Sequence, residues 1–403
     1  MSLEKTTIGE HCEITSSKRI FFSDYTDHGI PFFRSKEIIE MVQHKDISEA
    51  LFISQEKYDE IACKFGVPSA GDLLLTSVGT IGIPYIIKES DHFYFKDGNL
   101  TWFRNFDTGL LSAFLYYWFL SDKGIGILNN STIGSSQKAL TISNIKKIQI
   151  PLFPLNTQAK IVSILSGYDG LIENNQKQIK LLEEAAQRLY KEWFVDLRFP
   201  GWENTKIVDG VPEGWEKTTF GHICTVKKHI INIQENIPSD TPYIGLEHMP
   251  RHDFCLSEWG YAQSVSSSKF FFKKGDILFG KIRPYFHKVG FAICNGICST
   301  DAIVMSTEKQ LWSLLLMTAS SDEFVNHSYQ TCKEGSKMPR ADWRSMELFP
   351  VLIATHELIN SFNLIIESIC SKIEKLALEN NLLSESFDVL LQKIMSEKNG
   401  GLI

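Results

Sequence analysis

The sequence predicts an α+β fold in which two similar domains are separated by two long helices that pack as an antiparallel coiled coil. Three observations predict this class. The chain repeats its motifs once, over units of about 200 residues. Each copy contains short apolar stretches rich in Phe, Tyr, Ile and Val and bounded by Gly, Pro, Asp and Asn, which indicate strands and turns. Each copy then ends in a long segment with a seven-residue apolar period.

The two copies share short motifs in an unbroken order. EKTTIG at 4–9 recurs as EKTTFG at 216–221, and IPFFRSKEI at 30–38 is echoed by TPYIGLEHM at 241–249. GDLLLTSVGTIG at 71–82 aligns with GDILFGKIRPYFHKVG at 275–290. Later matches pair Ser121-Asp122 with Ser321-Asp322, 134–152 with 335–352, and TQAKI at 157–161 with THELI at 355–359. Units of this size are too large for solenoid repeats, so they indicate two copies of one domain-plus-helix module.

The period at the end of each copy predicts two long helices. Apolar residues alternate spacings of four and three from Ile161 to Trp193 and again from Ile359 to Ile394. Asn175 and Asn380 each interrupt an otherwise apolar seam. Each is either a tolerated polar residue or one half of a pair that fixes the register of the two helices. Prolines precede both helices, and Thr157 and Thr355 are their predicted caps.

These patterns divide the chain into four parts. Residues 1–154 form the first domain, 155–198 the central helix, 199–353 a linker with the second domain, and 354–403 the C-terminal helix. The linker, FPGWENTKIVDGVPEGW at 199–215, is rich in Gly and Pro. A helix of about 40 residues is about 60 Å long. Antiparallel helices of that length would hold the domains apart by a distance comparable to one or two turns of duplex DNA.

Composition excludes several classes of protein. Of 403 residues, 43% are hydrophobic and 22% charged, which is typical of a globular protein. The longest apolar run, at 110–120, is about half of what a membrane-spanning helix needs, so we expect a buried helix there and a cytoplasmic protein. The eight cysteines are scattered and predict free thiols. Cys294 and Cys298 lack a second ligand pair nearby, so no metal site is predicted.

The segment GDILFGKI at 275–282 has the glycine and lysine spacing of a nucleotide-binding loop. Position 282, however, is Ile rather than the Ser or Thr that would bind Mg²⁺. In the first copy Thr76 and Ser77 occupy the positions of Gly280 and Lys281. What the copies share is Gly-Asp followed by an apolar stretch, which predicts a turn and a core strand, with Lys281 and Arg283 carried to the surface beyond it.

The chain resembles the specificity subunit of type I restriction–modification systems over essentially its whole length. The most specific similarities are the junction PLNTQAKI at 154–161 ahead of the long helix, the domain start PEGW at 212–215 and the loop GSSQ at 134–137. Two motifs depart from the family. His356 stands where Gln is usual in the second junction, and the N-terminus lacks the P-x-G-W start.

The resemblance implies two target-recognition domains that each bind half of a split DNA site, and helices that act as spacer and docking site. Two adenine methyltransferase subunits and motor–nuclease subunits would be the partners. S-adenosylmethionine, ATP and Mg²⁺ would belong to those partners, and we expect no cofactor and no catalytic residue in this chain. The sequence contains no N-P-P-F/Y or D-P-P-Y motif for a flipped adenine.

Basic residues at matching places in the two copies are the candidate DNA contacts, because Lys and Arg bind phosphates while Arg and Gln also recognise base edges. The candidates for one half-site are Lys18, Arg19, Arg34, Lys36, Gln137 and Lys138. Those for the other are Lys227, Lys228, Arg251, Lys281, Arg283, Lys337 and Arg340. Base contacts are assigned to Arg34, Gln137, Arg251 and Arg283.

Three alternatives remain open, of which one is an ATPase that uses the segment 275–282. Each basic residue could be a solvated surface charge, since the net charge of the chain is −7. The whole protein could also be a coiled-coil adaptor whose paired domains bind proteins rather than DNA.

Overall fold

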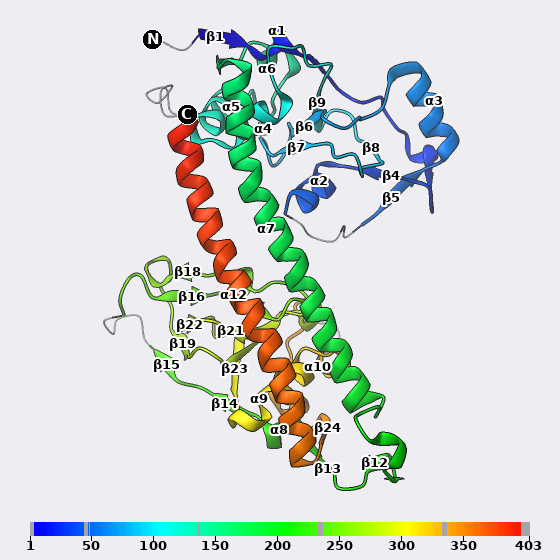
Figure 1. The fold of residues 1–403 in the computed structure, drawn as a ribbon, viewed down its shortest axis with the longest axis vertical. Helices are drawn as coiled ribbons and strands as arrows, with labels where there is room; N and C mark the ends of the chain where they lie inside the picture. Colours follow the sequence, from blue (N-terminus) through cyan, green and yellow to red (C-terminus); the bar gives the residue numbers. More distant parts are fainter. Residues whose placement is uncertain are drawn as a thin grey trace. The chain divides into compact units, whose positions relative to one another are not determined.

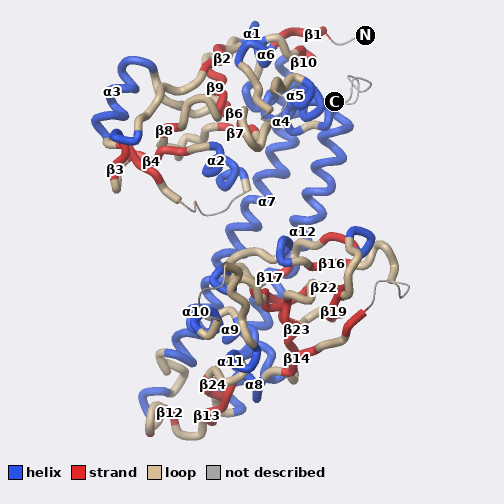
Figure 2. Tube along the Cα trace, turned by 180° about the vertical axis from the view of Figure 1, so that it is seen from behind, coloured by secondary structure: helices blue, strands red, loops and turns tan. Residues whose placement is uncertain are grey.

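The structure is a computed structural model that describes residues 4–43, 47, 49–134, 138–231, 237–332 and 337–395. The chain divides into two compact units, Met1–Gly170 with Leu383–Ile403 and Leu171–Leu382, here called unit 1 and unit 2. Each unit contains one domain and part of both long helices, α7 (Leu155–Tyr190) and α12 (His356–Met395) (Figure 1). Strands are short and joined by long loops in both units (Figure 2).

Within its described residues, unit 1 contains three sheets. Strands β1 (Glu4–Thr7) and β10 (Gln149–Leu152) pair antiparallel, which joins the start of the domain to the residues just ahead of α7. The second sheet has the order β2 (Glu13–Thr15), β9 (Leu100–Arg104), β6 (Leu73–Thr76), β7 (Pro84–Ile86). The third has the order β3 (Tyr25–Thr26), β5 (Leu51–Ile53), β4 (Ile30–Phe33), β8 (Tyr94–Phe95). The other helices are α1 (Ile8–His11), α2 (Ser35–Val42), α3 (Gln55–Phe65), α4 (Ser112–Leu120), α5 (Asp122–Asn130) and α6 (Ile142–Lys146).

The central strand β6 is buried on both faces, because successive side chains of a strand point to opposite sides of its sheet. Leu73 and Leu75 lie in one cluster with Phe114 and Trp118 of α4. Leu74 lies in another cluster with residues of β4 and β8 in the third sheet. Unit 1 is therefore layered as helices, sheet and sheet.

Unit 2 repeats this arrangement, but its two main sheets have five strands each instead of four. Strands β13 (Glu216–Thr219) and β24 (Pro350–Ile353) pair as β1 and β10 do. One five-stranded sheet has the order β14 (Thr225–Lys227), β23 (Ala302–Ser306), β20 (Ile277–Gly280), β21 (Val289–Ala292), β17 (Cys255–Leu256). The other has the order β15 (Ile230–Ile231), β19 (Lys269–Phe272), β22 (Gly296–Cys298), β16 (Pro242–Ile244), β18 (Gly260–Tyr261). The helices of the domain are α8 (Phe220–Ile223), α9 (Trp312–Ala319), α10 (Asp322–Gln330) and α11 (Trp343–Met346).

Strand β20 is the counterpart of β6 in packing as well as in sequence. Ile277 and Phe279 lie in a cluster with residues of α9 and α10. Leu278 points the other way, into a cluster with Ile244 and Phe272 of the second sheet. The Gly-Asp turns also match, since Gly71 and Gly275 both have a φ of 87°, a left-handed conformation that favours glycine. The internal repeat is thus a repeat of structure, and the predicted α+β class is confirmed.

The two long helices run antiparallel. Within unit 2, Asn175 of α7 hydrogen-bonds Asn380 of α12, and Trp193, just beyond α7, contacts Phe362. Residue numbers therefore rise along one helix as they fall along its neighbour. Within unit 1, Tyr168 of α7 contacts Phe387 of α12. Every seam residue predicted from the seven-residue period is buried or half-buried.

The start of α7 corrects one predicted cap. This helix begins at Leu155, so Thr157 lies inside it, and the amides of Thr157 and Gln158 bond the carbonyl of Pro154. Helix α12 begins at His356, immediately after the other predicted cap, Thr355. The prediction failed at Thr157 because β10 already ends at Leu152 and the carbonyl of Pro154 accepts the first helical amides, so the helix starts at Leu155.

The segment predicted as a linker contains structure of its own. Strands β11 (Ile207–Val208) and β12 (Val211–Pro212) form a hairpin. Phe199 and Trp215 are buried and in contact, with ring centroids 4.6 Å apart. Both ends of the segment are therefore anchored in the core of unit 2. Among the described residues no helix is both long and apolar enough to span a membrane, and the apolar run at 110–120 forms the buried helix α4.

Candidate nucleic-acid interface

The segment GDILFGKI at 275–282, which has the spacing of a nucleotide-binding loop, cannot hold a nucleotide phosphate, because its backbone amides already have partners. Such a loop needs several free N–H groups that converge on the phosphate. Here the amides of Gly275 and Asp276 bond the carbonyls of Ala292 and Lys273, and those of Gly280 and Lys281 bond Lys288 and Asp301. Residues 277–280 are strand β20, paired on both sides with β21 and β23. The segment is a turn followed by a core strand, as predicted.

Lys281 lies at the end of β20, beside other basic residues. Burial lowers the pKa of Lys281, Asp301 opposes this shift, and Arg340 and Lys228 lower the pKa further through their charges. Lys228 and Arg340 are therefore close enough to Lys281 for their charges to act on it. Arg340 is 58% exposed and pairs with Asp301 at 2.8 Å. This end of the sheet therefore carries three of the predicted DNA contacts around one acidic residue.

The loop before α11 is held against the residues that follow β20. Ile282 and Arg340 form a β-bridge, the amide of Arg283 bonds the carbonyl of Pro339, and the amide of Ala341 bonds that of Lys281. Lys337, at the start of the described part of this loop, is exposed. The loop thus adds its basic residues to the Lys281 end of the sheet.

Arg251 and Arg283 meet on one aromatic ring. The guanidinium carbon of Arg251 lies 3.9 Å from the ring centroid of Phe286, and that of Arg283 lies 5.7 Å from it. Phe286 also contacts Tyr285, which is 44% exposed and packs on Tyr329, 45% exposed. We call Arg251, Arg283, Tyr285, Phe286 and Tyr329 the arginine–aromatic platform. Guanidinium groups stacked on aromatic rings suit contact with DNA phosphates and base edges.

Lys227 is directed elsewhere. Its ammonium pairs with the buried carboxylate of Asp276 at 2.6 Å, and that carboxylate also accepts from the amide of Lys273. Lys227 therefore neutralises a buried acid in the Gly-Asp turn. Its assignment to DNA stays a prediction with a competing structural role.

In unit 1 the loop-on-strand contact recurs with different side chains. Val78 bridges Ala139, and the amide of Leu140 bonds the carbonyl of Ser77, which matches the Ala341–Lys281 bond. Ser77 is buried and bonds Thr101, whereas Lys281 is only half-buried. Lys138 is exposed in this loop, and Gln137 lies outside the described residues.

The remaining candidates of unit 1 have acidic or aromatic partners. Lys18 and Arg19 follow β2, with the ammonium of Lys18 4.5 Å from the Phe65 ring centroid and Arg19 paired with Asp97 at 3.2 Å. Arg34 donates to the buried carboxylate of Glu37 and also pairs with Glu49.

Hydrogen bonds to Glu37 raise the pKa of Arg34. Lys36 is exposed and lies 3.5 Å from the same Glu49. Arg34 would have to leave two carboxylates to contact a base.

The side chains of Thr6, His11 and Asp107 are arranged like a catalytic triad but cannot act as one. His11 contacts Thr6 through Nε2 at 2.9 Å and Asp107 through Nδ1 at 2.9 Å. The hydroxyl of Thr6, however, donates its proton to Glu10 at 2.5 Å. His11 thus meets a lone pair on Thr6 rather than the proton that a general base would remove. The group holds the turn at the start of the domain.

Two features of the site were missed by sequence reasoning. Tyr285 and Phe286 of the platform lie in the segment 269–288, which is rich in lysine and aromatic residues, but nothing in that segment distinguished Phe286, which contacts two arginines, from the buried Phe272 of β19. Glu183 of α7 is also buried, and its carboxylate accepts the amide of Phe254, two residues after His252. Glu183 lies next to the apolar seam of α7 but is not one of the positions that the seven-residue period assigns to it. The period therefore did not predict that Glu183 is buried.

Comparisons with known proteins point in one direction. Residues 2–184 match the model of the type I restriction modification DNA specificity domain. The chain is 25% identical over 352 residues to the type I restriction enzyme MjaIX specificity subunit of Methanocaldococcus jannaschii, covering 83% of this chain and 78% of that one. It is 34% identical over 140 residues to a putative type I restriction enzyme specificity subunit of Haemophilus influenzae, covering 35% of each.

A solved structure shares the fold. The crystal structure of the type I restriction–modification system S subunit from M. genitalium superposes with a TM-score of 0.60 at 15% sequence identity. The superposition covers 98% of this chain and 96% of that one.

Proposed function

Because the chain belongs to the family of type I restriction–modification specificity subunits, we propose that each of its two domains recognises one half of a split, asymmetric DNA site. The observation that carries this proposal is the repeated contact between a basic loop and the end of the central strand. Val78–Ala139 and Ile282–Arg340 are the same bridge in the two copies. The side chains around it differ, which is what two unequal half-sites require.

In unit 2 the DNA would lie against the platform and the Lys281 end of the sheet. Lys228, Lys281, Lys337 and Arg340 would bind phosphates, while Arg251 and Arg283 would reach base edges. In unit 1, Lys18, Arg19, Lys36 and Lys138 would bind phosphates. Arg34 and Gln137 stay the candidates for base contact there.

The long helices would serve as spacer and docking site for two adenine methyltransferase subunits, which motor–nuclease subunits would join. Large apolar residues exposed on α7 and α12, outside their shared seam, support this part of the proposal. They are Leu171 (51% exposed), Leu181 (65%), Leu364 (73%), Leu382 (65%) and Val389 (69%). S-adenosylmethionine, ATP and Mg²⁺ would bind to those partners. The chain itself is a non-catalytic subunit, and its contribution is recognition.

Co-expression with its methyltransferase subunit, followed by genome-wide mapping of methylated adenines, tests the proposal. We expect a split motif with a fixed gap that disappears when this chain is omitted. The variant Arg283→Ala should relax one half of the motif only. Methylation that does not depend on this chain, or a contiguous motif, would contradict the proposal.

Salt dependence separates DNA recognition from the adaptor alternative. Phosphate contacts release counterions, so the logarithm of the DNA affinity should fall linearly with the logarithm of salt concentration. An adaptor for proteins would show no such DNA affinity at any salt concentration.

A further inference from the structure

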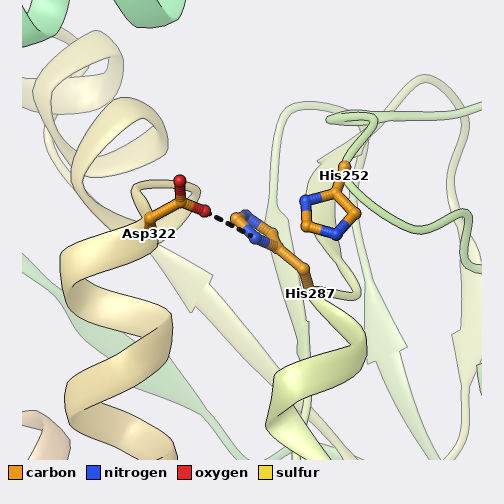
Figure 3. Close-up of side chains that lie close together, drawn as sticks. All are labelled: His252, His287 and Asp322. Carbon is orange, nitrogen blue, oxygen red and sulfur yellow. Dashed lines mark ion pairs between the residues drawn. The ribbon is translucent and has the colours of Figure 1, made fainter. Parts of the chain in front are cut away.

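Three ligand-type side chains from separate segments converge beside the platform. His252 lies in the loop before β17, His287 follows the 3₁₀ turn η6 (Pro284–Phe286), and Asp322 is the first residue of α10. One ligand atom from each lies within 4.8 Å of the others. The ring of His287 lies between the carboxylate of Asp322 and the ring of His252 (Figure 3). The backbones of the two histidines are joined by a 3.1 Å hydrogen bond from the amide of His252 to the carbonyl of His287.

The hydrogen bonds of His287 leave one of its nitrogens facing a carboxylate. Nε2 lies 2.9 Å from the carbonyl oxygen of Ser320. A carbonyl can only accept, so Nε2 carries a hydrogen and a neutral ring has its lone pair on Nδ1. That lone pair lies 3.3 Å from Oδ1 of Asp322. Two acceptors face each other, and only a cation between them removes the repulsion.

We propose that His252, His287 and Asp322 bind a divalent metal ion such as Zn²⁺. Imidazole nitrogen and carboxylate oxygen are ligands of such ions, and bonds of about 2.0–2.2 Å in a tetrahedron place neighbouring ligand atoms about 3.3–3.6 Å apart. The distance from Nδ1 to Oδ1 has this value already. His252 is exposed, so its ring can turn to complete a third bond. Solvent would take the fourth position.

The alternative cation is a proton on Nδ1, which would join only His287 and Asp322 and would give the nearby ring of His252 no role. The ring of His287 is only 4% exposed. The bond from Nε2 to a backbone carbonyl is also the usual outer contact of a metal-binding histidine, because it fixes the ring and its tautomer.

An ion here would fasten three segments that carry the platform. His252 follows Arg251, and His287 follows Phe286 and closes the turn that begins with Arg283. Two neutral imidazoles and one carboxylate would leave a divalent ion with one net positive charge. This consequence for DNA rests on the proposed function, whereas binding of the ion does not.

The first repeat offers a natural control. Asp122 occupies the place of Asp322, as the first residue of a helix capped by the preceding serine. The segment VGTIGI at 78–83, the counterpart of the turn with His287, contains no histidine. Asp122 should therefore take no part in metal binding, although its helix position is the same.

The test is metal binding by the full chain in the absence of DNA. After treatment with a chelator and removal of that chelator, the protein is titrated with Zn²⁺ by calorimetry and with Co²⁺ by visible absorption. We expect one ion per chain and a Co²⁺ spectrum of tetrahedral type. His252→Ala and Asp322→Asn should each weaken binding by about 100-fold or more, since loss of even an outer contact costs 10–100-fold. Asp122→Asn and His248→Ala should bind as the wild type does.

The two ligand variants lie at exposed positions, so circular dichroism should show an intact fold. Absence of a stoichiometric ion in the wild type would overturn the proposal. Equal affinity in all variants would overturn it too, because the ion would then lie elsewhere. DNA affinity is measured on the same proteins to keep the two proposals apart. Specific DNA binding without a bound ion would contradict the metal site but not the proposed function, and a bound ion without specific DNA binding would do the reverse.

Discussion

Nδ2 of Asn175 donates a 3.0 Å hydrogen bond to Oδ1 of Asn380 across the seam between α7 and α12 in unit 2. Asn175 is only 5% exposed, and apolar residues occupy the neighbouring seam positions. A buried polar pair in such a seam lowers stability but favours the register in which the two side chains meet. Of the two interpretations of these asparagines, pairing is the one that the structure supports.

Replacing either asparagine by leucine should therefore have a different effect from replacing both. Asn175→Leu or Asn380→Leu alone leaves one buried amide without its partner, which costs about 1–3 kcal/mol. The double variant removes both polar groups and should recover most of that loss. Denaturant unfolding of the four proteins should give a coupling energy of about 0.5–3 kcal/mol. Strictly additive effects would show that the pair does not couple the helices.

Glu183 should make the stability of unit 2 depend on pH. Burial and the charge of Asp253 raise the pKa of Glu183 to about 8 from its usual value of 4.5. Between these two values the folded protein holds a proton that the unfolded chain releases. Stability should therefore fall as pH rises through this window, by up to about 1.4 kcal/mol per pH unit.

Glu183→Gln should remove that slope, because the amide keeps an acceptor for the Phe254 amide and does not ionise. Melting temperatures from pH 5 to pH 9 would show it, with Glu184→Gln as the exposed neighbour of equal charge. A wild-type slope that Glu183→Gln leaves unchanged would place the responsible group elsewhere.

Gln158 and His356 occupy the same motif position but should differ in their importance for stability. Gln158 is buried, accepts the amide of Leu111, and donates to the carbonyls of Gly109 and Phe153. His356 is exposed and bonds only Asn360 among the contacts described. Gln158→Ala leaves several buried backbone groups unpaired and should cost about 2–4 kcal/mol, while His356→Ala should cost less than about 0.5 kcal/mol. Thermal unfolding of the two variants compares them directly, and similar losses would refute this difference.

The nucleotide-binding alternative for 275–282 makes a prediction that should fail. Since the amides of Gly275, Gly280 and Lys281 are bonded within the fold, ATP with Mg²⁺ should leave the melting temperature unchanged. Lys281→Ala should give the same null result and keep the fold. Stabilisation by ATP that disappears in Lys281→Ala would reverse this conclusion.

The parts of the fold that the sequence predicted are those set by local pattern. Strands β6 and β20 were predictable because a strand between two apolar layers is apolar at every position, and the long helices because their period is seven. The start of α7 and the structured linker were not predicted, since they depend on contacts such as Phe199 with Trp215 within the fold.

The site was less predictable because it depends on where turns direct their side chains. Lys227 and Lys228 are adjacent, yet the first pairs with buried Asp276 and the second lies near Lys281. Arg34 resembled a free cation in sequence, but Glu37 and Glu49 both bind it. The histidines of the proposed metal site come from distant segments, and no spacing motif could have joined them.

The platform supplies the most direct test of how unit 2 would recognise DNA. Arg251→Ala, Arg283→Ala and Phe286→Ala should each lower affinity for the methylated motif by about 1–3 kcal/mol and relax the same half-site. Arg251→Lys keeps the charge but loses the planar stack on Phe286, so it should rescue little. Lys337→Ala should instead weaken binding to all sequences and reduce the salt slope by about 1.

Lys309 offers a matched control, because it is exposed and lies beyond the other end of β23. Lys309→Ala should leave both affinity and salt slope unchanged. If the four variants that remove a positive charge lowered affinity equally, while Phe286→Ala and Arg251→Lys did not, net charge would explain DNA binding and the platform would have no special role. A loss of specificity confined to the arginine and phenylalanine variants would instead assign base recognition to the stacked pair, since only they share that ring.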